Sequence, residues 1–218
     1  MERYEILIGN DWDWVGEYKP EILRTLKLCL DEEGFQLEVG IKKILKSCEC
    51  LYLGEMEGVD CIPDEDFPKL KYLNIKPGAE IQYIISWTGV PRVAFPLLES
   101  ISLDSLYKLE KICHGQLAEG SFGNLRKLEV DGCHSLRFMF SSSAVGYFSK
   151  LQEIKIRGCT GMRAIVAKES EEEIEINDIT TNTMEFPQLR YIRIKYLPSL
   201  MGFYSGVDSH LLFNKKVR

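Results

Sequence analysis

One pattern of hydrophobic and polar positions recurs along the chain. A phenylalanine is followed by leucine, isoleucine or valine at the fourth, seventh and ninth positions, so the frame is F-x-x-L-x-x-L-x-L. The segments that carry the full frame are residues 67–75, 95–103, 122–130, 148–156 and 186–194. The last two apolar positions alternate with one polar position, which is typical of a strand with one buried face. The pattern therefore predicts a strand in each segment and a stack of the leading phenylalanines inside the fold.

Weaker copies of the strand motif occur earlier, at residues 1–6, 23–28 and 48–53. The motifs start near residues 1, 23, 48, 70, 98, 125, 151 and 189. Six of the spacings between these starts lie between 22 and 28 residues, and the last spacing is 38 residues. A period of about 20–29 residues is typical of a leucine-rich repeat. We therefore expect one domain of seven to eight irregular repeats over residues 1–218.

Beyond each strand motif the apolar residues recur about every third position. Leu103, for example, is followed by Leu106, Leu109 and Ile112. This period suits a 3₁₀ turn or a tight coil. Because one repeat cannot bury its own apolar face, the repeats must stack. The predicted fold class is an α/β repeat, a curved leucine-rich-repeat solenoid with a concave parallel β-sheet and a convex side of loops, 3₁₀ turns and few short helices. One short helix is expected at 36–47.

The net charge of −6 is concentrated in residues 168–185, which carry seven acidic residues and one lysine. This stretch also accounts for the long last spacing. We interpret it as an acidic loop insertion, because blocks of like charge are usually solvated; an acidic patch for a partner is the alternative. The remainder has equal numbers of acidic and basic residues. It therefore offers no electrostatic surface for nucleic acid.

No part of the sequence indicates a catalytic, cofactor or metal site. Cys133 and Cys159 occupy the same place in consecutive repeats and are expected to be buried. The pair Cys48-x-Cys50 has no second half, so a zinc site is not expected. No apolar run reaches the roughly 18 residues of a membrane span. The seven cysteines and the missing signal peptide indicate reduced thiols in the cytoplasm.

Several phrases of the sequence resemble a known family. Val130-Asp131-Gly132-Cys133, Ile156-Arg157-Gly158-Cys159 and the segment 109–117 are similar to the irregular repeats of plant nucleotide-binding leucine-rich-repeat disease resistance proteins of the coiled-coil class. The chain has no phosphate-binding G-x-x-x-x-G-K-[ST] loop, so it resembles a fragment that lacks the nucleotide-binding domain.

The resemblance implies a non-enzymatic, protein-binding module of a cytoplasmic plant immune receptor. Its expected partners are a pathogen effector or a guarded host protein, and the receptor's own nucleotide-binding domain, which the repeats would hold inactive. A leucine-rich-repeat substrate adaptor of an F-box ubiquitin ligase is the alternative function.

Binding is expected at the outward positions of the strands. Opposite charges should face each other across two neighbouring strands in the pairs Lys127 with Glu153, Glu129 with Lys155, and Asp131 with Arg157. The last strand has cations without such compensation. The candidate protein-binding residues on the concave face are Arg190, Tyr191, Arg193, Lys195, Tyr196, Lys155, Arg157, Tyr52 and Asn74.

Overall fold

The computed structural model describes residues 4–8, 24–29, 43–54, 59–167 and 186–205. The acidic stretch 168–185 lies outside the described residues, and so does most of the helix expected at 36–47. Residues 43–45, at the end of that expected helix, are helical.

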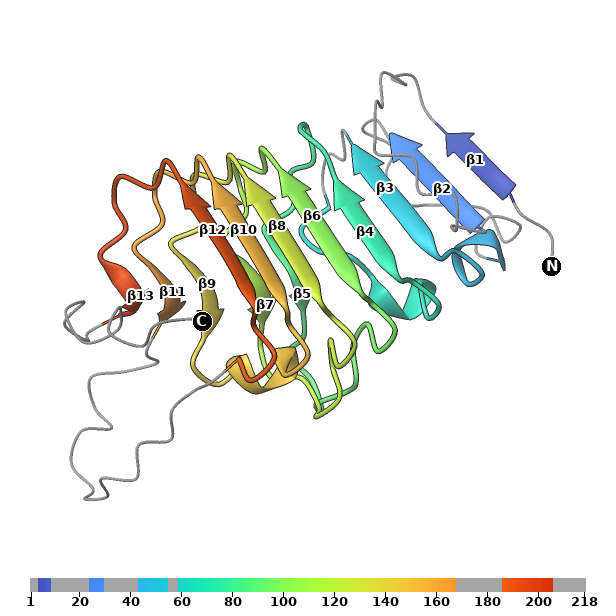
Figure 1. Cartoon of the computed structure of the whole chain (residues 1–218). Helices are drawn as coiled ribbons and strands as arrows, with labels where there is room; N and C mark the ends of the chain where they lie inside the picture. The colour runs from blue at the N-terminus through green and yellow to red at the C-terminus, as the bar shows by residue number, and fades with distance from the viewer. Residues whose placement is uncertain (1–3, 9–23, 30–42, 55–58, 168–185, 206–218) are drawn as a thin grey trace.

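A large parallel sheet runs along one side of the described structure (Figure 1). Its strands, in spatial order, are β1 (Tyr4–Ile8), β2 (Arg24–Cys29), β3 (Cys50–Gly54), β4 (Tyr72–Ile75), β6 (Ser100–Asp104), β8 (Lys127–Asp131), β10 (Glu153–Arg157) and β12 (Tyr191–Lys195). Each strand begins within three residues of a motif start expected from the sequence. Spatial order follows chain order, so each repeat adds one turn to a solenoid.

Shorter strands lie on the other side of the stacked turns (Figure 1). One small sheet pairs β5 (Tyr83–Ser86) with β7 (Lys111–His114); the other contains β9 (Phe138–Ser141), β11 (Ala164–Ala167) and β13 (Gly202–Tyr204). Two 3₁₀-helices, η1 (Asp64–Asp66) and η2 (Val145–Phe148), precede β4 and β10. The small strands differ from the expected coil. Leu106 and Leu109 lie outside strands as expected, but Ile112 lies in β7, where neighbouring turns are close enough to pair.

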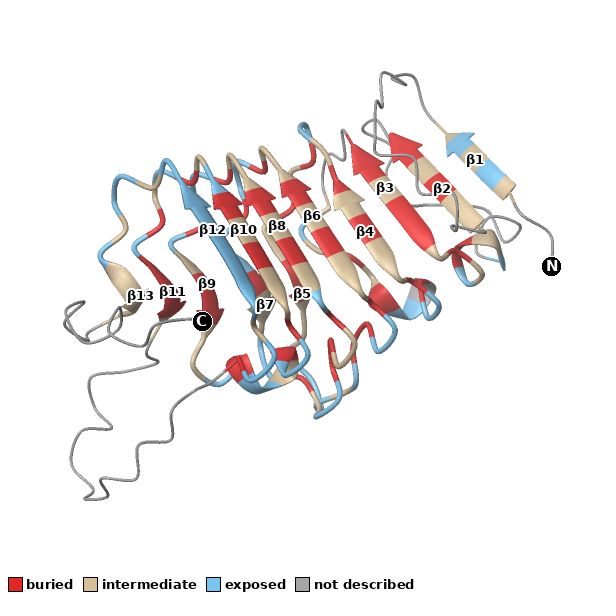
Figure 2. Cartoon of the chain, viewed as in Figure 1, coloured by how far each residue is buried: buried red, intermediate tan, exposed pale blue. Residues whose placement is uncertain are grey.

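The core lies between the two layers of strands and continues from turn to turn (Figure 2). Strand β6 shows the usual alternation, with Ile101 and Leu103 buried between half-buried polar residues. The expected phenylalanine stack is confirmed in its centre, since the ring centroids of Phe122 lie 5.7 Å from Phe95 and 5.3 Å from Phe148. The inward side of each turn is therefore completed by the side chains of the next.

The stack does not pass directly from Phe148 to Phe186. Phe140, from β9, lies between them, with ring centroids 4.6 Å from Phe148 and 5.2 Å from Phe186. Phe203 follows at 6.2 Å from Phe186. The sequence frame did not predict these two additional rings, which come from the opposite layer and extend the aromatic row to the last described turn.

A left-handed residue ends several strands of the large sheet. Ser105, Gly132, Gly158 and Tyr196 each follow the last strand residue and have φ values of 54°, 63°, 66° and 55°. The N–H groups of the first three donate to the last strand carbonyl of the next turn at 2.8–3.0 Å. This turn therefore links neighbouring repeats. Glycine adopts the left-handed region without steric cost, whereas a serine or tyrosine is strained there.

Replacement of Phe122 by alanine should strongly destabilise the solenoid. Its ring is fully buried between two other phenylalanines, and deletion of such a side chain costs about 3–5 kcal/mol. Urea unfolding followed by circular dichroism measures this loss. Tyr107→Ala is the control, because Tyr107 is 62% exposed. Equal losses for the two variants would show that the aromatic row does not stabilise the stack.

Replacement of Tyr196 by glycine should stabilise the protein. The left-handed conformation costs a side-chain-bearing residue about 1–2 kcal/mol, and glycine adds about 0.5–1 kcal/mol of unfolded-state entropy. A net gain of roughly 0.5–1 kcal/mol in the free energy of unfolding is expected. Tyr107→Gly, at an exposed tyrosine without a positive φ, should instead lose stability. The strain argument fails if both variants lose stability alike.

Candidate protein-binding face

The outward side chains of the large sheet form rows across the strands. In the central row each residue is the register partner of the next. The row consists of Lys27, Tyr52, Asn74, Ser102, Glu129, Lys155 and Arg193. Parallel strands lie about 4.8 Å apart, so the row presents side chains at a fixed spacing. This is the geometry expected of a rigid surface for protein recognition.

A zigzag of ion pairs crosses β8 and β10. Lys155 Nζ lies 2.7 Å from a carboxylate oxygen of Glu129 and 2.5 Å from one of Glu153. Lys127 Nζ lies 3.1 Å from Glu129 on its own strand. The register of Lys127 opposite Glu153 is as expected, but no ion pair joins these two described residues. Lys127 and Glu129 lie two residues apart on β8 and so point to the same side, which lets Lys127 reach Glu129 on its own strand.

This network shifts the pKa values of its central members. Partial burial would by itself raise the pKa of Glu129, but the hydrogen bonds from Lys155 and Lys127 outweigh burial and lower it. Hydrogen bonds from Lys155 to Glu129 and Glu153 raise the pKa of the lysine. Both shifts favour the charged forms. Lys155 is thus already occupied by two carboxylates, and it is a weaker candidate for a partner than its sequence position suggested.

Arg157, the second candidate on β10, is held less tightly by carboxylates than Lys155 is. Its guanidinium lies 3.8 Å from a carboxylate oxygen of Asp131, as the register predicted. Both side chains of this pair are largely exposed, and an exposed pair of this kind contributes at most about 1 kcal/mol. A partner carboxylate could therefore compete with Asp131 for Arg157.

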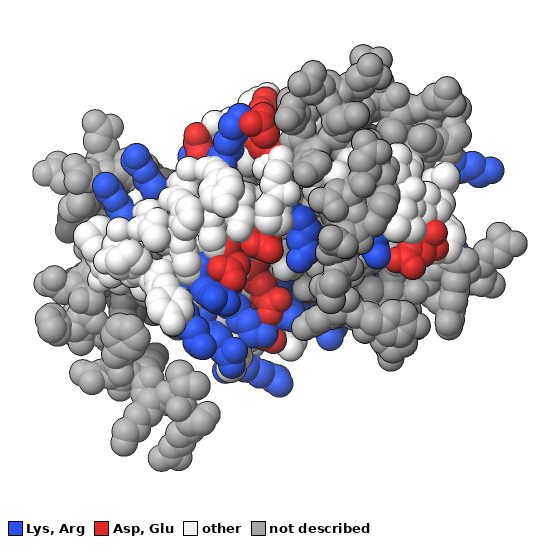
Figure 3. All heavy atoms as spheres, turned by 90° about the horizontal axis from the view of Figure 1, so that it is seen from above, with Lys and Arg blue, Asp and Glu red and all other residues white. Residues whose placement is uncertain are grey.

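The last strand of the sheet presents cations and an aromatic ring. All residues of β12 are exposed. The guanidinium of Arg193 lies 5.5 Å from the ring centroid of Tyr191, and Lys155 Nζ lies 5.9 Å from the same centroid. Within the described residues, Arg190, Arg193 and Lys195 form no ion pair. Seen from above, basic side chains gather beside a group of acidic ones (Figure 3).

Two of the candidate residues flank β12 instead of lying on it. Arg190 precedes the strand and is exposed. Tyr196, which was expected to be part of the strand's surface, follows its last residue in the left-handed turn and is 76% exposed. Both still lie within one residue of β12, so they extend the same surface at its two ends.

Tyr52 and Asn74 form a separate pair. They are register partners on β3 and β4, and β3 is five strand spacings, about 24 Å, from β12. Lys27 Nζ lies 5.5 Å from the ring centroid of Tyr52. The amide nitrogen of Asn74 lies 3.9 Å from Cys50 Sγ. The candidate residues thus fall into two groups that one small contact could not cover.

The apolar side of β12 is a feature that the sequence pattern did not indicate. Ile192 and Ile194 occupy the inward positions of the repeat, yet they are 42% and 39% exposed. In the part of the chain that the structure describes, no further strand of the large sheet follows β12. The pattern predicts which side of a strand faces inward, but it cannot show whether a neighbouring turn covers that side.

The cysteines form no disulfide bonds. All seven are free thiols, and Cys133 and Cys159 are fully buried, as their shared place in the repeat predicted. Each of these two thiols donates to the backbone carbonyl two residues earlier, at 3.5 Å and 3.4 Å. Burial raises the pKa of Cys48 and Cys113 to about 12. Neither of the latter is therefore a thiolate at neutral pH, as a nucleophile would need to be.

Among the described residues, no group of three or more histidine, cysteine, aspartate or glutamate side chains is arranged to hold a metal ion. The described helices are also too short or too polar to cross a membrane.

The fold is a leucine-rich-repeat solenoid. Its parallel strands follow chain order, its core is rich in leucine and isoleucine, and most of its repeats are 22 to 28 residues long. Residues 97–214 match the family described as plant disease resistance protein RPS2-like, leucine-rich repeats. The match covers more than half of the chain, which therefore belongs to this family. The chain is thus a leucine-rich-repeat region of the kind found in plant disease resistance proteins, and such a region is a non-catalytic module. No curated protein and no solved structure matches the chain.

The stability of the protein should fall in acid through Glu129. A carboxyl whose folded pKa is lowered stabilises the fold above its unfolded pKa, near 4.3, and this stability is lost as the pH falls through the folded value. Between pH 6 and pH 3 the wild type should lose up to about 1 kcal/mol more than Glu129→Gln. Urea unfolding at both pH values measures the difference.

Glu119→Gln serves as the matched control, because Glu119 is exposed and forms no ion pair among the described residues. This control should keep the pH dependence of the wild type. An identical pH dependence for Glu129→Gln and the wild type would show that the zigzag contributes nothing to folding.

Proposed function

We propose that these repeats are the protein-binding region of an intracellular plant immune receptor of the coiled-coil class. In this role they recognise a pathogen effector or a guarded host protein in the cytoplasm. In the resting receptor they contact its nucleotide-binding domain and hold it inactive. The observation that supports this proposal best is the group of exposed cations around Tyr191 on the last described strand of the large sheet, which form no ion pair with another described residue.

The β12 surface has the composition of an interaction hot spot. Arginine and tyrosine are enriched where side-chain truncation costs the most binding energy. The guanidinium of Arg193 lies over the ring of Tyr191, and this contact orients the guanidinium before a partner arrives. Among the described residues no carboxylate has to be displaced from Arg193 or Lys195, whereas a partner that binds Lys155 must compete with Glu129 and Glu153. Charge therefore favours an acidic partner surface over β12.

Residues next to β12 enlarge the proposed contact surface. Arg157 lies beside Lys195 in the register of β10 and β12, so its weak pair with Asp131 places another cation next to the proposed contact. Arg190 and Tyr196 lie at the two ends of the strand. Tyr52 and Asn74 belong to a second area, nearer the N-terminus, which would contact a different part of a large partner.

Reversal of charge at β12 tests the proposal. In the receptor that carries these repeats, Arg193→Glu combined with Lys195→Glu should weaken partner binding by about tenfold or more, or release the resting receptor into activity. The expected size follows from the cost of about 2 kcal/mol for a charged hot spot. Cell-death signalling in leaves and co-immunoprecipitation with the nucleotide-binding domain report the two roles separately.

A matched control reverses two exposed lysines elsewhere, in Lys46→Glu with Lys69→Glu. Neither forms an ion pair among the described residues, and this variant should signal as the wild type does. Unchanged signalling and unchanged partner binding in the β12 variant would reject this site and direct attention to Tyr52 and Asn74.

A further inference from the structure

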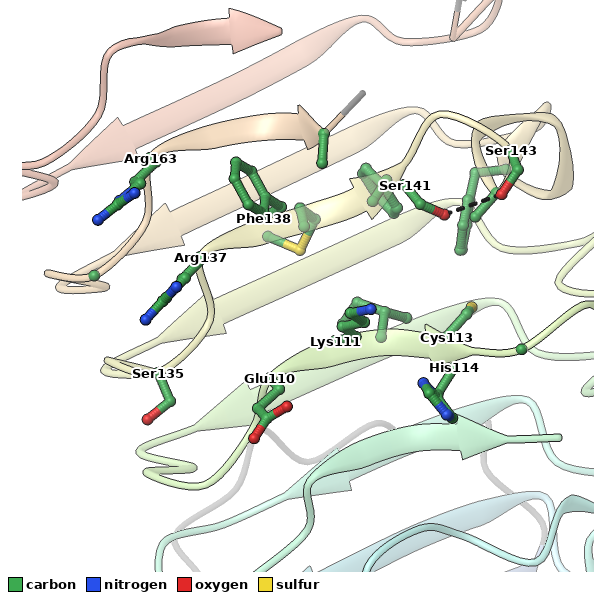
Figure 4. A pocket seen from close by; sticks show the side chains of 18 of the residues that line it. Glu110, Lys111, Cys113, His114, Ser135, Arg137, Phe138, Ser141, Ser143 and Arg163 are labelled. Carbon is green, nitrogen blue, oxygen red and sulfur yellow. Dashed lines mark hydrogen bonds between the residues drawn. The ribbon is translucent and has the colours of Figure 1, made fainter. Parts of the chain in front are cut away.

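Two arginines occupy the same place in consecutive turns on the small-strand side. Arg137 directly precedes β9, Arg163 directly precedes β11, and both are exposed. The N–H of Arg163 donates to the carbonyl oxygen of Arg137 at 2.8 Å. Because the backbones of the two turns are joined in this way, the two side chains start close together. Figure 4 shows them side by side and pointing the same way.

The backbone that carries the two arginines is held firmly. Leu136 and Met162, the residues before the arginines, are both fully buried in the core. Gly161 approaches the preceding turn so closely that a Cβ atom there would lie 2.1 Å from the carbonyl oxygen of His134. The spacing of the two turns is therefore fixed by backbone packing, and the arginine pair is arranged before any ligand arrives.

The break in the ladder of small strands separates the arginine pair from an acidic residue. Glu110 occupies the equivalent place one turn before Arg137. Among the described residues, no backbone hydrogen bond runs from Arg137 N–H to the Glu110 carbonyl, although the next turn has the matching bond. The carboxylate of Glu110 instead accepts a hydrogen bond from Gln82 Nε2 at 2.8 Å.

Neither arginine is neutralised by another described side chain. No ion pair joins Arg137 or Arg163 to a described carboxylate. Two like charges side by side repel each other, and an anion placed against both removes this repulsion. The pair therefore favours a ligand with more than one negative charge.

The arginines line a cavity of about 1140 Å³ that spreads over the turns of β7, β9, β11 and β13. Its lining also includes the exposed Lys111 of β7 and the half-buried Phe138 of β9 (Figure 4). Lys111 forms no ion pair with a described residue. Among the described residues of the lining, Glu110 is the one carboxylate. The cavity thus combines a basic end with an aromatic surface and a further cation.

We propose that Arg137 and Arg163 bind the phosphoryl group of a phosphorylated serine or threonine in a partner protein. Such a group carries a charge of about −1.5 to −2 and three strong acceptor oxygens, enough to receive paired N–H groups from both guanidiniums. A single carboxylate has two oxygens, which one arginine already occupies in a bidentate contact. Arginine clusters are a recurrent means of recognising phosphorylated segments.

The remainder of the phosphorylated segment lies along the cavity. An apolar neighbour of the phosphorylated residue packs on Phe138, and an acidic neighbour pairs with Lys111. The site is on the small-strand side of the solenoid, whereas the proposed β12 surface belongs to the large sheet. The two sites are consequently independent, and either one functions without the other.

A short fluorescent peptide with one phosphoserine, flanked by valine and glutamate, tests the proposal on the full 218-residue chain. Fluorescence anisotropy should show saturable binding, and Arg137→Gln with Arg163→Gln should weaken it by about tenfold or more. Arg137→Lys with Arg163→Lys should also bind more weakly, because lysine keeps the charge but cannot make the bidentate contact. Absent binding by the wild type, or equal binding by the wild type and the glutamine variant, overturns the proposal.

A matched control removes the same charge elsewhere, in Lys46→Gln with Lys69→Gln. Both lysines are exposed and absent from the cavity lining, so this variant should bind within about twofold of the wild type. Circular dichroism of all variants checks that the fold is intact. The β12 variant Arg193→Glu with Lys195→Glu should bind the peptide as the wild type does. A loss of binding in that variant alone would place the peptide on β12 and reject the cavity.

The chemistry of the ligand needs its own comparison. The same peptide with unmodified serine should bind about tenfold more weakly or worse, and the version with glutamate in place of phosphoserine should also bind more weakly. Equal binding of either version would reject recognition of a phosphoryl group. Equally tight binding of inorganic phosphate or of a short uridine RNA would show a general anion site and would also reject the proposal.

Discussion

The structure depends on one constraint: no turn of the solenoid can bury its own apolar face. Each inward leucine or isoleucine is covered by the turns before and after it, and Phe122 illustrates this by contacting a phenylalanine from each neighbour. Burial, register and the position of the next strand are therefore coupled. The exposed inward isoleucines of β12 mark the place where, among the described residues, this covering stops.

The same coupling controls the surface. Because the core fixes the register, Lys155 stands opposite Glu129 on one side and Arg193 on the other. Glu129 neutralises Lys155, whereas Arg193 finds no described carboxylate and approaches the ring of Tyr191. A chain whose charges balance outside residues 168–185 can thus present a basic area, since local pairing and not net charge decides which cations remain available.

The sequence predicted the parts of the fold that repeat and missed the parts that do not. The L-x-L motif indicated the strands of the large sheet and their register, because the same burial requirement recurs in every turn. It could not indicate the left-handed conformations of Ser105 and Tyr196, where a non-glycine residue follows the backbone of its neighbours Gly132 and Gly158. The short pair from Lys127 to Glu129 was missed because it depends on side-chain reach and not on register. For the proposed binding role of β12, the sequence offers only the composition of that strand as support.

The ladder of small strands breaks between β7 and β9, while the core continues beneath the break. Backbone pairing fails between β7 and β9, but the aromatic row continues beneath, since Phe140 of β9 contacts both Phe148 and Phe186. Ile112 of β7 and Met139 of β9 remain buried on the two sides of the break. Stability resides in the continuous core, which leaves the small-strand layer free to vary from turn to turn.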